Sequence, residues 1–150
     1  MSNISSSLIQ KLREESGAGV MDSKKALEEA GGDLVKAQEI LRERGLQKMA
    51  KRADRSTGAG MIFSYIHGGR IGALLDLRAE TDFVVRSEPF QKLAQEIVMQ
   101  IAAAGPENVE ELLTQPYIRD EKRVIKDLIQ DLVAKVGENI QINSFSRLQI

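Results

Sequence analysis

The segment from Pro89 to Ala104 has the clearest hydrophobic periodicity in this chain of 150 residues. Its apolar residues recur at spacings of about three and four, the pattern of a helix with one buried face. Ser87 and Pro89 are residues that favour the start of a helix. So continuous an apolar face must be covered by a second layer of structure. The periodic residues are Phe90, Leu93, Ala94, Ile97, Val98 and Ile101.

The residues before this helix predict a β-hairpin that could supply the second layer. Residues 61–67 and 70–77 are rich in apolar and β-branched side chains, and Gly68–Gly69 between them is typical of a two-residue turn. The chain becomes polar after this hairpin, from Arg78 to Asp82, before the helix begins.

The C-terminal third predicts one more helix and one more strand. A long amphipathic helix is predicted from about residue 119 to 136, after a short acidic segment at 107–113. Residues 140–148 alternate well enough for a strand, with one face formed by Ile140, Ile142, Ser144, Ser146 and Leu148. We therefore predict an α+β fold for this part, with helices packed on an antiparallel three-stranded sheet in the order β-β-α-α-β.

The first 45 residues predict a bundle of three short helices. Ser5 or Ser6 can cap the first helix, and the glycines in Ser16–Gly19 end it. Asp22 is the predicted N-cap of the second helix. Gly31–Gly32 ends that helix, after which Asp33 caps the third and Gly45 is its expected stop.

A connector follows this bundle and marks the predicted domain boundary. The stretch from Arg42 to Arg55 is basic, and Ser56–Gly60 has the composition of a flexible linker. We divide the chain into an N-terminal module at residues 1–54 and an α+β core domain at residues 55–150.

The composition excludes several classes of function. The chain has no cysteine, which excludes disulfides, thiolate nucleophiles and cysteine-based metal sites. Its net charge of -1 and its scarcity of aromatic residues do not favour nucleic-acid binding. No apolar run reaches membrane-spanning length and the first 16 residues lack an apolar signal core, so a cytoplasmic location is expected.

The side chains that catalysis would require are also missing. His67, the only histidine, precedes a glycine turn and has no candidate partner in the sequence. Ser16–Gly19 follows a predicted helix instead of a strand and lacks the lysine of a phosphate-binding loop. The glutamates at 107, 110 and 111 are typical of a solvated face. We predict a binding protein, not an enzyme, with no catalytic residues, no metal and no cofactor.

One short polar segment, Thr81 to Val85, has the character of a binding protrusion. An aromatic residue, Phe83, lies beside a carboxylate, Asp82, in a connection between two rigid elements. The pattern itself leaves open whether the Phe83 ring projects into solvent or folds back into the core.

Three motifs, in order, resemble those of bacterial translation elongation factor Ts. The first is Ser16–Asp22 followed by Lys24–Leu27, the second is Thr81–Arg86 and the third is Val136–Ile140. Their order and spacing agree with the family over the whole chain. The departures, at Val20, at Arg78–Ala79 and at Val85–Arg86, are conservative. Longer members have a duplicated core and a coiled-coil excursion, so this chain resembles the short form.

The resemblance implies a guanine-nucleotide exchange factor for elongation factor Tu, a GTPase. The N-terminal module is then similar to a ubiquitin-associated (UBA) domain that docks on the GTPase. Because this chain has one copy of the core, the resemblance implies that two chains pair as a homodimer to complete it. The site residues implied are Gly17, Gly19, Met21 and Asp22 in the N-terminal module, and Thr81, Asp82, Phe83 and Val84 in the segment that disturbs the Mg²⁺ site.

Two other functions remain open at this point. The three-helix module alone is compatible with recognition of ubiquitin-like proteins or with a chaperone role. The basic residues between Lys48 and Arg55 are compatible with an RNA-binding accessory protein. Neither alternative accounts for the segment from Thr81 to Arg86.

Overall fold

The computed structural model describes residues 4–150. The chain divides into two compact units, Met1–Lys51, described from residue 4 onward, and Arg52–Ile150. The first unit is helical, and the second combines helices with an antiparallel three-stranded sheet, which confirms the predicted α+β class. The division between the units falls just before the predicted boundary after residue 54. Residues 1–3 of the predicted module lie outside the described residues.

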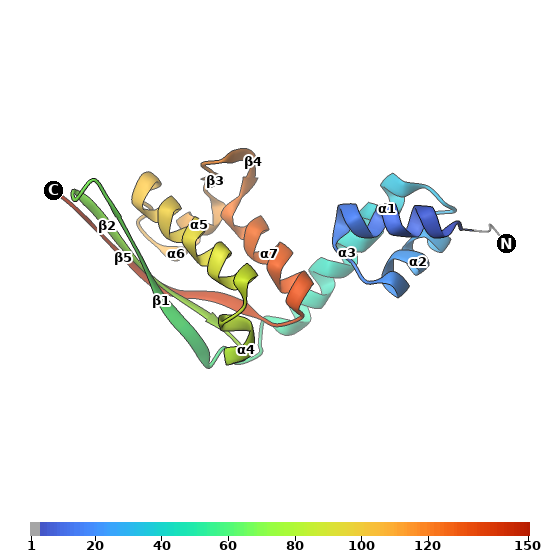
Figure 1. The fold of residues 1–150 in the computed structure, drawn as a ribbon, viewed down its shortest axis with the longest axis horizontal. Helices are drawn as coiled ribbons and strands as arrows, with labels where there is room; N and C mark the ends of the chain where they lie inside the picture. The colour runs from blue at the N-terminus through green and yellow to red at the C-terminus, as the bar shows by residue number, and fades with distance from the viewer. Residues whose placement is uncertain (1–3) are drawn as a thin grey trace. The chain divides into compact units, whose positions relative to one another are not determined.

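Three helices form the first unit: α1 (Ser6–Ser16), α2 (Val20–Glu29) and α3 (Leu34–Arg52) (Figure 1). Of the two predicted candidates, Ser5 and not Ser6 caps α1, because the Ser5 hydroxyl accepts a hydrogen bond from the Leu8 N–H. The carboxylate of Asp33 accepts from two N–H groups at the start of α3, which confirms the predicted cap. The core is small and consists of Leu12, Ala26, Leu27 and Ala37 with partly buried neighbours.

Two predicted helix ends in this unit are wrong. Gly19, not Asp22, occupies the N-cap position of α2, and Asp22 lies in the first turn, where its carboxylate faces the positive end of the helix. Gly45 does not stop α3, which continues to Arg52. A glycine inside a helix costs only about 1 kcal/mol relative to alanine. Ion pairs tie the helix to α2 on both sides of this glycine, from Arg44 to Glu29 and from Lys48 to Asp22.

The sheet of the second unit contains β1 (Ala59–His67), β2 (Ile71–Ala79) and β5 (Ile140–Gln149), in the order β1-β2-β5. All neighbours are antiparallel. His67 pairs with Ile71, so residues 68–70 connect the hairpin instead of the predicted two glycines alone. Both glycines have positive φ, 57° and 66°, as a tight reversal requires. The expected flexible linker is shorter than predicted, because β1 already begins at Ala59.

Strand β5 contains a bulge that changes which residues face the core. Asp76 pairs with Ser144 whereas Leu77 pairs with Ile142, so Asn143 is an extra residue. Ile140 is buried before the bulge, but after it Phe145 and Arg147 are the partly buried positions. The predicted single face is therefore wrong: Ser144, Ser146 and Leu148 are exposed and lie on the face opposite Ile140 and Ile142.

Helices α4 (Asp82–Val85), α5 (Glu88–Ala104), α6 (Val109–Thr114) and α7 (Ile125–Val136) complete the second unit. Figure 1 shows α5 and α7 on the same side of the sheet, where α5 packs against β1 and β2. Every periodic residue predicted for α5 is buried: Phe90, Leu93, Ala94, Ile97, Val98 and Ile101. The rings of Phe63 and Phe90, 6.2 Å apart, join the sheet to the helix.

The helix predicted from residue 119 begins only at Ile125, because a second, two-stranded sheet precedes it. Its strands are β3 (Pro116–Tyr117) and β4 (Asp120–Val124). The fully buried amide of Gln100 on α5 holds this hairpin: it donates to the Pro116 carbonyl and accepts from the Ile118 N–H, at 3.1 and 3.0 Å. Among the described residues, no helix has the length and apolar character needed to cross a membrane.

Candidate partner-binding site

The single turn of helix α4 places two valines in the core and one phenylalanine in solvent. Val84 and Val85 are 4% and 2% exposed, whereas Phe83 between Asp82 and Val84 is 86% exposed. Successive residues of a helix point about 100° apart, so anchoring two neighbours inward turns the residue before them outward. The Phe83 ring is therefore part of the surface and not of the core, which settles the alternative left open by the sequence.

Hydrogen bonds fix this turn at both ends. Thr81 is its N-cap, and its hydroxyl lies 3.4 Å from the Val84 N–H. At the other end, the Ser87 hydroxyl donates to the Val84 carbonyl at 2.6 Å and the Gln91 side chain donates to the Val85 carbonyl at 2.8 Å. The exposed ring thus stands on a short helix whose ends are both tied to the surrounding fold.

A shallow surface hollow accompanies α4 and is lined by Asp82, Phe83, Arg86 and Ser87. It presents an apolar ring between a carboxylate and a guanidinium group, a combination suited to a protein surface with apolar and charged groups. Three of the predicted site residues, Thr81, Asp82 and Phe83, are exposed here, and Thr81 also caps the turn, whereas Val84 is buried beneath it. Arg86 was not predicted as a site residue, although it lies in the second motif.

A polar network next to α4 involves the third motif, for which the sequence predicts no role. The Glu138 carboxylate accepts from the Thr81 N–H at 2.9 Å and from the Thr81 hydroxyl at 2.7 Å. The neighbouring Asn139 is only 6% exposed, and its N–H donates to Glu80 at 2.7 Å. Its side-chain amide donates to the carbonyls of Ala53 and Arg55, at 3.3 and 3.0 Å.

The predicted residues of the N-terminal module surround the turn between α1 and α2. Gly17 is the C-cap of α1 with a φ of 69°, and Gly19 is the N-cap of α2. Met21 is 61% exposed, and Val20 beside it, which is not among the predicted site residues, is 49% exposed. Asp22 forms an ion pair with Lys48. The glycines thus shape a turn after which two apolar side chains are exposed at the start of α2.

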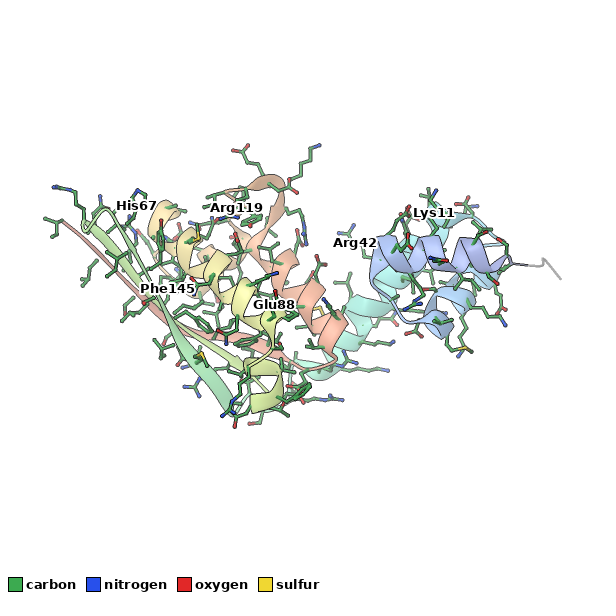
Figure 2. The ribbon with its side chains drawn as sticks, viewed as in Figure 1. Lys11, Arg42, His67, Glu88, Arg119 and Phe145 are labelled. Atoms are coloured by element: carbon green, nitrogen blue, oxygen red, sulfur yellow. The ribbon has the colours of Figure 1, made fainter. Side chains whose placement is uncertain are left out.

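The described residues contain no group of three or more histidines, cysteines, aspartates or glutamates that could hold a metal ion. His67 lies at the end of the β1–β2 hairpin (Figure 2), where its Nδ1 is 2.9 Å from the Tyr65 hydroxyl. The two strongest candidates for binding are therefore the α4 surface in the second unit and the start of α2 in the first.

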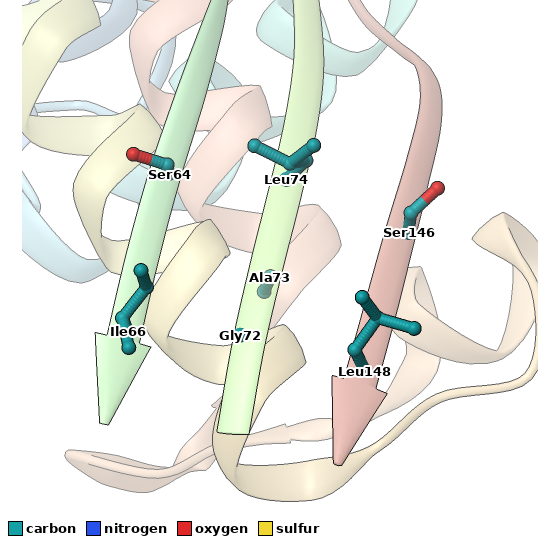
Figure 3. A pocket seen from close by; sticks show the side chains of 7 residues that line it. All are labelled: Ser64, Ile66, Gly72, Ala73, Leu74, Ser146 and Leu148. Carbon is teal, nitrogen blue, oxygen red and sulfur yellow. The ribbon is translucent and has the colours of Figure 1, made fainter. Parts of the chain in front are cut away.

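The face of the sheet opposite α5 is a second notable surface of the core unit. Figure 3 shows Ile66, Leu74 and Leu148 there, one on each strand, among small residues. These three side chains are 70%, 51% and 79% exposed. Exposed apolar side chains that lie together on one face are a candidate surface for contact with another protein. The smaller residues that line the same depression are Ser64, Gly72, Ala73 and Ser146.

Comparison with known proteins places these features in a family. Residues 80–150, which contain α4 and the third motif, match the family model described as Elongation factor TS. The chain is 42% identical to Elongation factor Ts of Anaeromyxobacter dehalogenans, with 98% of this chain and 88% of that protein covered. It is 40% identical to Elongation factor Ts of Oleidesulfovibrio alaskensis over its whole length and 99% of that protein. Elongation factor Ts of Leptospira biflexa is also 40% identical, with 98% of both chains covered.

Proposed function

Because the chain belongs to the elongation factor Ts family of translation elongation factors, we propose that it is a guanine-nucleotide exchange factor. In this proposal it binds elongation factor Tu·GDP and promotes GDP release by disturbing the Mg²⁺ site. It acts in the cytoplasm, makes or breaks no covalent bond and needs no nucleic acid. The observation that carries the proposal is the 86% exposure of Phe83 on a turn whose flanking residues are anchored.

In this mechanism, burial of the Phe83 ring in the partner supplies the free energy that displaces the helices supporting the Mg²⁺ site. GDP is held by phosphate contacts and by a Mg²⁺ ion that neutralises them. Phe83 inserts between helices that support this site, while Asp82 anchors the segment on the partner surface. Burying a phenylalanine ring contributes roughly 2–3 kcal/mol. If this free energy stabilises a conformation of the partner in which those helices are displaced, it weakens Mg²⁺ and GDP binding by one to two orders of magnitude. GDP must then weaken binding of the factor by the same ratio.

The N-terminal unit has the role of a docking module similar to a UBA domain. Its supporting feature is the exposed pair Val20 and Met21 beside the Gly17–Gly19 turn. A tethered second contact raises the effective concentration of the first, so the module increases affinity more than the exchange rate. A chain that lacks residues 1–54 should bind the GTPase more weakly but retain exchange at saturating concentration. Equal affinity of the truncated and complete chains would contradict this division of roles.

The decisive experiment measures release of fluorescent GDP from elongation factor Tu. Phe83→Ala should slow the catalysed release by roughly ten- to a hundredfold, and Asp82→Ala should slow it less. Ile118→Ala is the matched control, because it also truncates an exposed apolar side chain, 45% exposed, on the β3–β4 connection. Normal exchange by Phe83→Ala, or an equal loss in Ile118→Ala, would overturn the proposal.

We also propose that the core unit forms a homodimer. The support is the uncovered sheet face with Ile66, Leu74 and Leu148, which a second copy of the same face could cover. Leu74→Lys on the central strand would place a charge in that interface. Sedimentation should show a dimer for the wild-type chain at tens of micromolar and a monomer for Leu74→Lys, and a wild-type monomer would overturn the proposal.

A further inference from the structure

We propose that Glu138 is a positioning residue for Phe83, which assigns a role to the third motif. Its carboxylate holds the N-cap of α4 and thereby fixes the turn that keeps the Phe83 ring in solvent. The inference rests on the proposed exchange function, since that function gives the ring its task. Glu138 is 57 residues away from Thr81 along the chain, so the fold alone brings the second and third motifs together.

Helix α4 depends on outside support because it is only four residues long. The first turn of a helix orders several residues for a single hydrogen bond, so an isolated turn does not persist in water. Its N-cap residue, Thr81, has an extended backbone with φ -129° and ψ 152°. The contacts that hold Thr81 in this conformation therefore also determine the residue at which the turn begins.

The Glu138 carboxylate binds both donors of Thr81. One oxygen accepts from the Thr81 N–H at 2.9 Å, and the other accepts from the Thr81 hydroxyl at 2.7 Å. Because the hydroxyl hydrogen is directed at Glu138, the hydroxyl lone pairs are left to accept from the Val84 N–H. Hydrogen bonds to an ionised group are roughly twice as strong as those between neutral groups. Glu138 therefore fixes both the backbone and the rotamer of the capping residue.

Glu138 is itself held by its neighbours in the turn between α7 and β5. Gly137 ends α7 with a φ of 75°, and the N–H of Asn139 is bonded to Glu80 at 2.7 Å. Glu80 immediately precedes Thr81 in the chain. The Glu138 carboxylate thus reaches Thr81 from a turn that is fastened on both sides.

The test compares Glu138→Ala with Glu138→Gln, which retains one acceptor oxygen, and with Glu121→Ala as control. Glu121 is an exposed residue of β4 whose replacement changes the net charge equally. We expect Glu138→Ala to lower the maximal rate of GDP release from elongation factor Tu about tenfold at saturating factor. Glu138→Gln should show a smaller loss, and Glu121→Ala none.

A double mutant separates positioning from a general structural role. In the Phe83→Ala background, adding Glu138→Ala should slow release no further, because the residue that it positions is already absent. Additive losses, or a maximal rate unchanged by Glu138→Ala, would overturn the inference.

Amide hydrogen exchange of the free chain provides a readout that needs no partner. Glu138→Ala should accelerate exchange at the Val84 and Val85 amides, which are hydrogen-bonded to Thr81, while the amides of α5 remain protected. Unchanged protection of both valines would overturn the inference. A wild-type chain that fails to accelerate GDP release would instead overturn the proposed function, and hydrogen exchange would then decide alone whether Glu138 holds α4.

Discussion

Arg147 on β5 donates from both Nε and Nη2 to the carbonyl oxygen of Ala102 in the last turn of α5, at 3.1 and 3.0 Å. Carbonyls in the last turn of a helix lack intrahelical partners. The residue four positions after Ala102 is Pro106, which has no N–H to offer. The arginine therefore satisfies a carbonyl that the helix cannot satisfy itself.

Replacing this arginine should destabilise the core unit. Arg147→Met keeps much of the side-chain volume but removes both hydrogen bonds, so the free energy of unfolding should fall by about 1.5–3 kcal/mol. Urea denaturation followed by circular dichroism measures the change. Arg147→Lys, which retains one charged donor, should lose less, and a denaturation midpoint of Arg147→Met equal to the wild type would show that the bond does not contribute.

Gly60 on β1 should not tolerate a side chain. A Cβ at this position would lie 2.4 Å from Cδ of Arg78 and 2.9 Å from the Leu77 carbonyl oxygen. Arg78 cannot move freely, because its guanidinium binds both oxygens of Asp76 at 2.6 and 3.0 Å. Gly60→Ala should cost about 1–3 kcal/mol of stability. Gly58→Ala is the control, since nothing lies within 4 Å of a Cβ there. Thermal unfolding of the two variants decides, and equal melting temperatures would contradict the prediction.

Ser23 on α2 should be replaceable by alanine with a gain in stability. Its side chain is fully buried and its hydroxyl has no hydrogen-bond partner in the described part of the chain. An unsatisfied buried hydroxyl costs about 1–3 kcal/mol, and alanine also has the higher helix propensity. Ser23→Ala should raise the melting temperature of the N-terminal unit, whereas Ser56→Ala, at an exposed position, should not. A lower melting temperature for Ser23→Ala would show that the hydroxyl is satisfied in solution.

Tyr117 on β3 should ionise only at high pH. Burial raises the pKa of its hydroxyl to about 12, and the hydrogen bond to the Glu96 carboxylate acts in the same direction. In Tyr65→Phe, where Tyr117 is the only remaining tyrosine, phenolate absorbance should have its midpoint near pH 12. Adding Glu96→Gln should lower that midpoint.

The pKa of Tyr117 is higher in the folded chain than in the unfolded chain, and this difference determines how its contribution to stability changes with pH. An unfolded tyrosine has a pKa of about 10. The contribution of Tyr117 to stability is therefore complete below pH of about 10 and is lost as the pH rises toward the folded pKa of about 12. Alkaline unfolding that began at the same pH with and without Glu96→Gln would contradict this linkage.

Local patterns in the sequence were sufficient to predict much of the fold. The spacing of apolar residues predicted α5, and the six residues predicted for its inner face are all buried. Asp33 was predicted as a cap, and Ser5 was one of two candidates for the other. These features depend on interactions within a few residues. The predicted stop at Gly45 was wrong because a glycine ends a helix where its backbone takes a positive φ, and Gly45, unlike Gly17 and Gly137, does not take one. The β3–β4 hairpin was missed because the buried amide that stabilises it, that of Gln100, lies on another element.

For the candidate site, too, local sequence patterns predicted only part of the arrangement. The motif around Asp82 and Phe83 was visible in the sequence, but the direction of the Phe83 ring was not. That direction depends on the burial of Val84 and on the contact between Thr81 and Glu138, which are distant in sequence. Periodicity cannot reveal a hydrogen bond of this kind, and the three-dimensional fold is needed to identify it.

The bulge at Asn143 has a consequence for how this family can change in length. On both sides of Asn143 the strand keeps its partners on β2, so deletion of this one residue would leave a regular strand in which Phe145 and Arg147 still face the helices. Deletion of Ser146 would instead turn Arg147 away from the helices and Leu148 toward them. The bulge therefore marks a place in β5 where evolution can remove one codon without altering the core and the opposite face together.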